Sequence, residues 1–100
     1  MAKVVTTIEE FKAEIGKENT VVDFFAEWCG PCKMFAPLFD QVAESEKDAN
    51  FIKVDIDQLR EAADEYGIQS IPTVLKFKSG EEVNRHVGSL GKDDLVKFAK

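Results

Sequence analysis

The sequence predicts an α/β fold in which helices cover both faces of a mixed central sheet. Apolar stretches of strand length alternate with stretches of helical periodicity, in the order β-α-β-α-β-α-β-β-α. The early strands are separated by helices and are expected to pair in parallel, whereas a tight turn joins the last two strands into a hairpin. With 100 residues, 44% of them hydrophobic, the chain can bury one core, so residues 1–100 are expected to form a single domain.

Two strand–helix units are expected in the first half of the chain. A short strand around residues 4–6 precedes a helix that begins at the capping box Thr7-Ile8-Glu9-Glu10. Residues 20–26 are rich in Val and Phe and too short for a typical helix, which predicts a strand buried on both faces. The next helix should be kinked by Pro37 and fade in the polar stretch 44–50. The residues expected on its apolar face are Met34, Phe35, Leu38 and Val42.

The second half of the chain is expected to begin with one more strand–helix unit and to continue as a hairpin. Residues 51–56 are predicted to form a strand, and residues 59–66 a helix that Gly67 ends. A strand over residues 73–77 is followed by a Lys-Ser-Gly-Glu turn and by a strand that ends near Val87. A last helix carries two Asp residues in its first turn, where negative charge is favourable.

The charge and hydropathy of the chain exclude several classes of partner. Its formal net charge is -6 and its pI is near 4.8, which argues against nucleic-acid binding because that binding depends on clustered Lys and Arg. No segment approaches the length of a membrane span, and residues 1–7 contain no apolar stretch typical of a signal peptide. We therefore expect no membrane partner and a cytoplasmic location. In that compartment a close pair of cysteines is more typical of catalysis or metal binding than of a structural disulfide.

Cys29 and Cys32 are the only two cysteines, and they lie where an apolar strand gives way to a helix. Two thiols spaced C-x-x-C in the first turn of a helix can close a small disulfide, and the free N–H groups there favour a negative sulfur. Cys29 comes first and is expected to be the more exposed thiol, which makes it the candidate to attack a target disulfide. Cys32 would then resolve the mixed disulfide. Between them, Gly30 would let a substrate backbone approach and Pro31 would stiffen the turn.

A metal site is the alternative interpretation of the C-x-x-C motif. A tetrahedral zinc site needs about four ligands, and this chain offers two cysteines and His86. Carboxylates or a second chain would have to complete the set. We therefore expect no metal and no cofactor beyond a redox-active disulfide. Two inert core thiols fit poorly with a Gly-Pro pair between them.

Asp23 is placed by strand alternation on the same face as Val21 and Phe25, where apolar packing is otherwise expected. Burial would raise the pKa of this carboxyl, so that it could take the proton from Cys32 when that thiol attacks. A paired structural carboxylate on a partly open face is the alternative, and the nearby C-x-x-C motif favours the proton-transfer role. Lys53 in the neighbouring strand would favour the charged carboxylate if it lay beside Asp23, but a lone strand lysine more commonly extends to solvent.

The sequence pattern does not fix the roles of three further residues. Pro72 follows Ile71 at the start of a strand, and because only about 5–6% of X–Pro bonds in folded proteins are cis, statistics predict a trans bond. Trp28 could belong to the core or to a contact surface. His86 is expected on the exposed side of an edge strand.

Taken together, these segments resemble the thioredoxin family. The run Asp23–Lys33 contains W-C-G-P-C-K after a strand that carries an Asp, and Pro37, Ile71-Pro72-Thr73, Gly80 and Gly88 follow at matching distances. A solitary C-x-x-C is a weak signal, but this combination is highly specific and spans nearly the whole chain. It implies a thioredoxin-like three-layer α/β/α fold with a mixed central sheet. One departure is Phe25, which stands where many relatives carry a second tryptophan.

The resemblance also implies roles for individual residues. Cys29 corresponds to the attacking thiol, Cys32 to the resolving thiol, Asp23 to a buried acid and Lys53 to the lysine beside it. Pro72 corresponds to a cis proline, against the statistical expectation. The backbone beside it would pair with an extended substrate. The docking surface implied in this way consists of Trp28, Gly30, Pro31, Ile71, Pro72, Val87 and Gly88.

The function predicted from the resemblance is general protein-disulfide reduction. The partners it implies are disulfide-containing protein substrates and a thioredoxin reductase, and we expect the chain to act as a monomer. The first alternative is a thiol oxidase or isomerase on the same fold, in which the dithiol is the more stable form. The second is a binding module that uses its cysteines only as a switch. The Gly30-Pro31 pair between the cysteines resembles the reductases of the thioredoxin family, which favours the first function over the alternatives.

Overall fold

The computed structural model describes residues 2–100 and confirms the predicted order of elements. Within this range the strands are β1 (Lys3–Val5), β2 (Thr20–Phe25), β3 (Asn50–Asp55), β4 (Thr73–Lys78) and β5 (Glu81–Val87). The helices are α1 (Ile8–Ile15), α2 (Gly30–Ser45), α3 (Arg60–Glu65) and α4 (Lys92–Ala99). Each of these elements begins and ends within a few residues of its predicted position.

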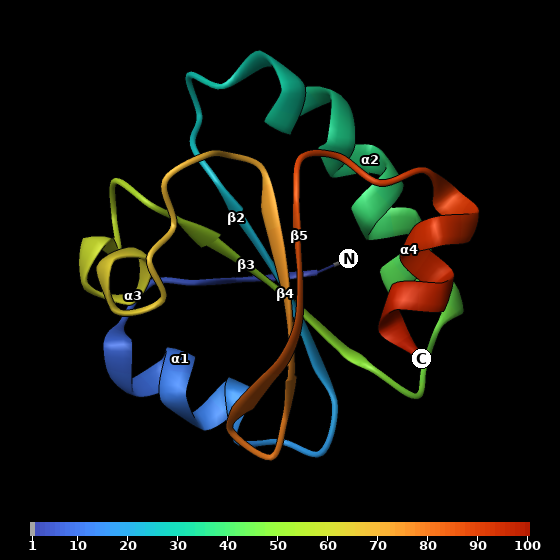
Figure 1. The fold of residues 1–100 in the computed structure, drawn as a ribbon, viewed down its shortest axis with the longest axis horizontal. Helices are drawn as coiled ribbons and strands as arrows, with labels where there is room; N and C mark the ends of the chain where they lie inside the picture. Colours follow the sequence, from blue (N-terminus) through green and yellow to red (C-terminus); the bar gives the residue numbers. More distant parts are fainter. Residues whose placement is uncertain (1) are drawn as a thin grey trace.

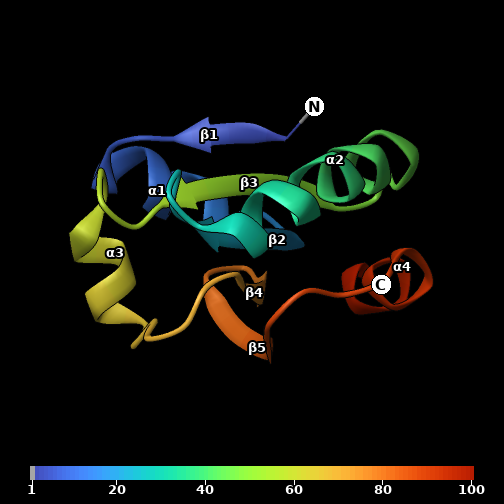
Figure 2. The same ribbon diagram turned by 90° about the horizontal axis from the view of Figure 1, so that it is seen from above.

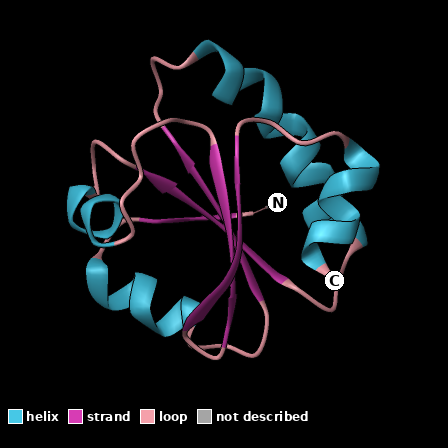
Figure 3. Cartoon of the chain, viewed as in Figure 1, coloured by secondary structure: helices cyan, strands magenta, loops and turns pink. Residues whose placement is uncertain are grey.

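One mixed sheet organises the fold, with the strand order β1-β3-β2-β4-β5. β3 pairs in parallel with both β1 and β2, whereas β4 pairs antiparallel with β2 and with β5. α1 and α3 lie on one side of the sheet and α2 and α4 on the other, as Figures 1 and 2 show. The predicted three-layer α/β/α architecture is therefore confirmed (Figure 3). No helix of residues 2–100 has the length and hydropathy needed to cross a membrane.

The alternation of β2 divides its side chains between two cores. Val22 and Phe24 pack with α1 and α3 in one apolar cluster, and Val21 packs with α2 and α4 in the other. Asp23 follows the alternation of Val21, so its carboxylate enters the side of the sheet that α2 covers. Burial on both faces accounts for the nearly continuous apolar character of this strand.

α2 begins just beyond the end of β2, and Figure 1 shows its first turns projecting past the edge of the sheet. Cys29 is its N-cap residue, and Pro31 occupies the first turn, where its missing N–H costs nothing. Pro37 lies inside the helix, which continues to Ser45. The fold thus brings the cysteine pair to the carboxyl end of a central strand, the usual location of function in open α/β sheets.

Candidate active site

The two cysteines form a disulfide across the first turn of α2, with their Cα atoms 5.2 Å apart. The Sγ atom of Cys29 accepts the backbone N–H of Cys32 at 3.2 Å. Both residues are buried, with 5% of Cys29 and 3% of Cys32 exposed. Cys29 was expected to be the more exposed thiol, and in this oxidised state the difference is small, because Ala26 and Ile71 pack against the pair.

The start of α2 provides an electrostatic setting that favours a thiolate. A helix N-terminus carries partial positive charge, and the N–H of Cys32 already points at the sulfur of Cys29. No acidic residue lies in the first turn of the helix. A thiolate formed at Cys29 on reduction would therefore be stabilised by the backbone.

The segment before β4 lies against the disulfide. The Ile71–Pro72 peptide bond is cis, so the expectation from statistics is wrong and the one implied by the family resemblance is confirmed. The intrinsic trans preference of about 0.5–1 kcal/mol is small enough for the contacts of a folded chain to outweigh it. The carbonyl oxygen of Ile71 lies 3.8 Å from Sγ of Cys29, and that of Pro72 accepts the N–H of Gly88 at 2.8 Å.

Trp28 lies on the surface beside the disulfide, with 68% of its area exposed. Its indole N–H donates to Oδ2 of Asp57 at 2.7 Å, and the backbone N–H of Asp57 donates to Asp55 at 2.9 Å. Asp57 did not emerge from the sequence analysis. The signal that could have found it is its position just after β3, because the carboxyl ends of parallel strands meet at one edge of a sheet.

The rim around the disulfide is apolar. Val87 is 59% exposed and is the last residue of β5, directly before Gly88. Met34 is 84% exposed, although the helical pattern placed it on the buried face of α2. The buried residues of α2 are Cys32, Phe35, Phe39 and Val42, so Met34 lies on the side of the helix that faces solvent. A shallow pocket between this helix and the loop after β5 is lined by Pro31, Met34, Phe35, Leu38, Ser89 and Leu90.

Asp23 is buried, as its place in β2 predicted, with 1% of its area exposed. Neither of its carboxylate oxygens has a hydrogen-bond partner among residues 2–100. Burial raises the pKa of Asp23 from 3.8 to about 7; the charge of Lys53 opposes this increase and that of Asp40 adds to it. Near neutral pH this carboxyl can therefore both accept and release a proton.

Lys53 is the partner of Asp23 in the parallel register of β2 and β3. It is half-buried, and its Nζ atom lies 4.9 Å from the centroid of the Phe25 ring. Lys53 was expected either to lie beside Asp23 or to extend to solvent. It leaves the sheet on the same side as Asp23. Its side chain lines the wall of an open pocket. His86, which was expected on an exposed strand face, is half-buried in β5.

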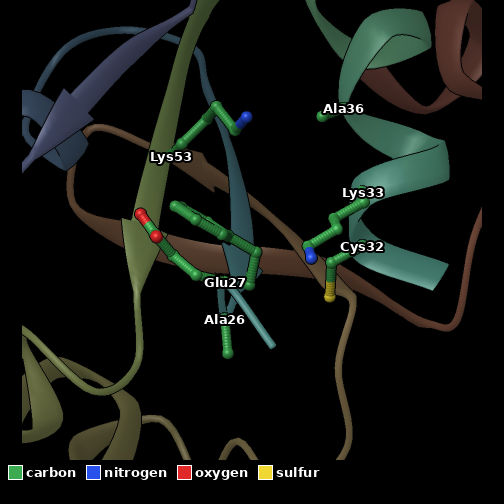
Figure 4. Close-up of a pocket in the computed structure, with 7 residues that line it drawn as sticks. Ala26, Glu27, Cys32, Lys33, Ala36 and Lys53 are labelled. Carbon is green, nitrogen blue, oxygen red and sulfur yellow. The ribbon is translucent and has the colours of Figure 1, made fainter. Parts of the chain in front are cut away.

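The pocket that contains Lys53 has a volume of about 240 Å³ and opens beside Cys32. Lys53 extends from β3 toward the side formed by α2, which carries Cys32, Lys33 and Ala36 (Figure 4). The remaining lining residues are Phe25, Ala26 and Glu27. Within residues 2–100 there is no group of three or more His, Cys, Asp or Glu side chains that could hold a metal ion.

A disulfide at a helix N-terminus, flanked by a cis proline and backed by a buried acid, defines a thiol–disulfide oxidoreductase. The family model for thioredoxin matches residues 2–100. The chain therefore belongs to the thioredoxin family.

Curated relatives and solved structures agree with this assignment. The chain is 44% identical to thioredoxin of Chlamydia trachomatis over 98 residues, which is 98% of this chain and 95% of the relative. It is 42% identical to thioredoxin of Bacillus subtilis, with the same coverage. The solution structure of oxidised Plasmodium falciparum thioredoxin matches with a TM-score of 0.91 and 38% identity, over 100% of both chains. The chain thus has protein-disulfide reductase activity, and its family generally works with disulfide substrates and a thioredoxin reductase.

Proposed function

We propose that the chain is a general protein-disulfide reductase in which Cys29 attacks and Cys32 resolves. The thiolate of Cys29 attacks one sulfur of a target disulfide, which forms a mixed disulfide and releases the other target sulfur as a thiolate. Cys32 then attacks Sγ of Cys29, which closes the intramolecular disulfide and releases the second target thiolate. Two electrons pass from the cysteine pair to the target, and protons from solvent neutralise the released thiolates.

The observation that carries this proposal is the contact between Sγ of Cys29 and the start of α2. The N–H of Cys32 lies 3.2 Å from that sulfur and would stabilise the attacking thiolate. Asp23 is proposed to take the proton of Cys32 during resolution, because burial raises its pKa to about 7. Lys53, on the same side of the sheet, adjusts the proton affinity of Asp23 through its charge.

The apolar rim is proposed as the docking surface for an extended segment of the substrate. Ile71 presents its carbonyl oxygen beside the disulfide, and exposed backbone at this edge can pair with a strand-like segment. The residues assigned to this surface are Trp28, Gly30, Pro31, Ile71, Pro72, Val87 and Gly88. Its partners would be disulfide-containing proteins, and a thioredoxin reductase would return the two electrons. We further propose that residues 1–100 act as one monomeric domain in cytoplasmic electron transport.

Thiol-dependent reduction of insulin disulfides tests this function. Cys29→Ser is expected to abolish turnover, because Cys29 is the N-cap residue of α2 and its sulfur is the one that accepts the backbone N–H of Cys32. Full turnover by Cys29→Ser would exclude the proposed mechanism. Equilibration of the wild-type pair against a glutathione buffer separates a reductase from an oxidase or isomerase, since a strongly oxidising potential would contradict the reductase assignment.

A further inference from the structure

We propose that Phe25 is a positioning residue for disulfide exchange: its ring holds the ammonium of Lys53 at the pocket wall and keeps it out of an ion pair with Asp23. The inference rests on the proposed proton transfer from Cys32 to Asp23.

The backbone places the three side chains on one face of the sheet. Asp23 and Phe25 are two residues apart in β2, so both point to the side that α2 covers. Lys53 pairs with Asp23 in the parallel register, and its side chain leaves β3 on the same side. The ammonium therefore has two attractive neighbours, a carboxylate and an aromatic ring.

The structure shows which neighbour the ammonium contacts. Nζ of Lys53 lies 4.9 Å from the ring centroid of Phe25, within the roughly 6 Å at which a cation is attracted to a ring face. The ion pairs found among residues 2–100 do not include Lys53. Both oxygens of Asp23 are without a hydrogen-bond partner in the same range. Lys53 thus acts on Asp23 through its field and not through contact.

The separation of the Lys53 ammonium from the Asp23 carboxylate matters because a direct contact would change the pKa of Asp23. An opposite charge in contact lowers the pKa of a carboxyl by about 1–3 units, which would make Asp23 a weaker proton acceptor at neutral pH. The ring offers the ammonium a partner that lies at the pocket and not in the buried interior. Without the Phe25 ring, the unpartnered carboxylate of Asp23 is the group on that face that attracts the Lys53 ammonium most strongly.

Few other charges face Asp23. From α2, Asp40 raises its pKa, and the thiol of Cys32 adjoins the pocket in the reduced state. From β4, the residue opposite Asp23 is Val74, which carries no charge. Lys76 of β4 is on the same face but lies opposite Val21, and it is not among the charges that shift the pKa of Asp23. The pocket is also lined by Glu27 and Lys33, which are both exposed to solvent. Lys53 is therefore the cation whose position we expect to control the titration of Asp23.

The test is an NMR titration of the Asp23 carboxyl carbon in the oxidised protein, which requires no turnover. Phe25→Leu removes the ring and is expected to lower the titration midpoint by about one pH unit, as the ammonium turns to the carboxylate. Phe25→Trp keeps a ring and should leave the midpoint within a few tenths of a unit of wild type. In a Lys53→Met background, Phe25→Leu should produce no shift, because the cation is gone.

An unchanged or raised midpoint in Phe25→Leu would overturn the proposal, as would an equal shift in the Lys53→Met background. Phe25→Met provides a second ringless variant should the leucine variant not fold, with the same expected decrease. The proposed proton transfer is tested separately by the rate of resolution in Asp23→Asn. A normal rate there would remove the functional role of Asp23 without affecting the titration result.

Discussion

Asp23 and Lys53 are register partners in the parallel β2–β3 ladder, yet their charged groups do not form an ion pair. The carboxylate is buried without a hydrogen-bond partner among residues 2–100, and the ammonium lies over the ring of Phe25. Because the opposing charge acts only at a distance, burial dominates and raises the pKa of Asp23 to about 7. Asp23 is therefore a proton acceptor of near-neutral pKa on the face of the sheet that α2 covers.

The first prediction concerns the resolution of the mixed disulfide by Cys32, the step in which Asp23 is proposed to accept a proton. Asp23→Asn removes the acceptor and should slow the closure of the Cys29–Cys32 disulfide at least about 100-fold at pH 7. The first attack by Cys29 should change less, because that thiolate is stabilised by the helix terminus. Stopped-flow fluorescence of Trp28 with a disulfide peptide separates the two steps. Equal slowing of both would contradict the assigned role.

The second prediction concerns stability. An acid whose pKa is raised by folding binds its proton more tightly in the native state, so its contribution favours folding below pH 4 and is lost as pH rises toward 7. At about 1.4 kcal/mol per pKa unit, the ionised group costs up to about 4 kcal/mol above pH 7. Asp23→Asn should therefore be more stable than wild type at pH 8, and the difference should shrink toward pH 4.

Urea unfolding of the two oxidised proteins at pH 4 and pH 8 measures this difference. Asp40→Asn is a useful companion variant, because loss of the Asp40 charge should lower the pKa of Asp23 and reduce the effect. A free energy difference between wild type and Asp23→Asn that does not depend on pH would show that Asp23 has an ordinary pKa.

The third prediction concerns the orientation of Trp28. Its indole N–H donates to Asp57 at 2.7 Å, so Asp57→Ala should free the ring and raise KM for a protein substrate about three- to tenfold. Reduction of a small disulfide reagent should be nearly unchanged, since it needs no docking surface. Arg60→Gln is the matched control, because its 3.5 Å contact with Asp57 is exposed and weak. The same KM increase in both variants would contradict a specific role for the indole bond.

The fourth prediction concerns docking on β5. Val87 and Val83 are both exposed valines of this strand, at 59% and 47%, but only Val87 lies near Gly88 and the site. Val87→Ser should raise KM for a protein substrate several-fold, because apolar contact area is lost. Val83→Ser should leave KM unchanged. Similar values for the two variants would remove β5 from the docking surface.

Much of the fold was predictable because the chain has clear periodic patterns. The apolar character of residues 20–26 indicated a doubly buried strand, and its alternation placed Asp23 on the face that α2 covers. The cysteine pair was found from its spacing and from its place before a helix. These features depend on residues close in sequence, which is why the sequence alone reveals them.

Other features depend on contacts between distant segments and could not be derived from local pattern. Pro72 was expected to be trans on statistics, and only the resemblance to a family indicated the cis bond. Met34 was expected on the apolar face of α2, but the buried face is formed by Cys32, Phe35, Phe39 and Val42, and Met34 faces solvent. The contact between Lys53 and Phe25 requires the register of two strands, which no single segment specifies.

The central claim is that Cys29 attacks the substrate and Cys32 resolves, and trapping of the mixed disulfide tests it most directly. Each single Cys→Ser variant is incubated with a disulfide-bonded protein substrate, and the products are analysed by intact and peptide mass spectrometry. We predict that Cys32→Ser accumulates a mixed disulfide through Cys29, whereas Cys29→Ser forms almost none. Accumulation of a mixed disulfide through Cys32 in the Cys29→Ser variant, at a comparable rate, would contradict the account.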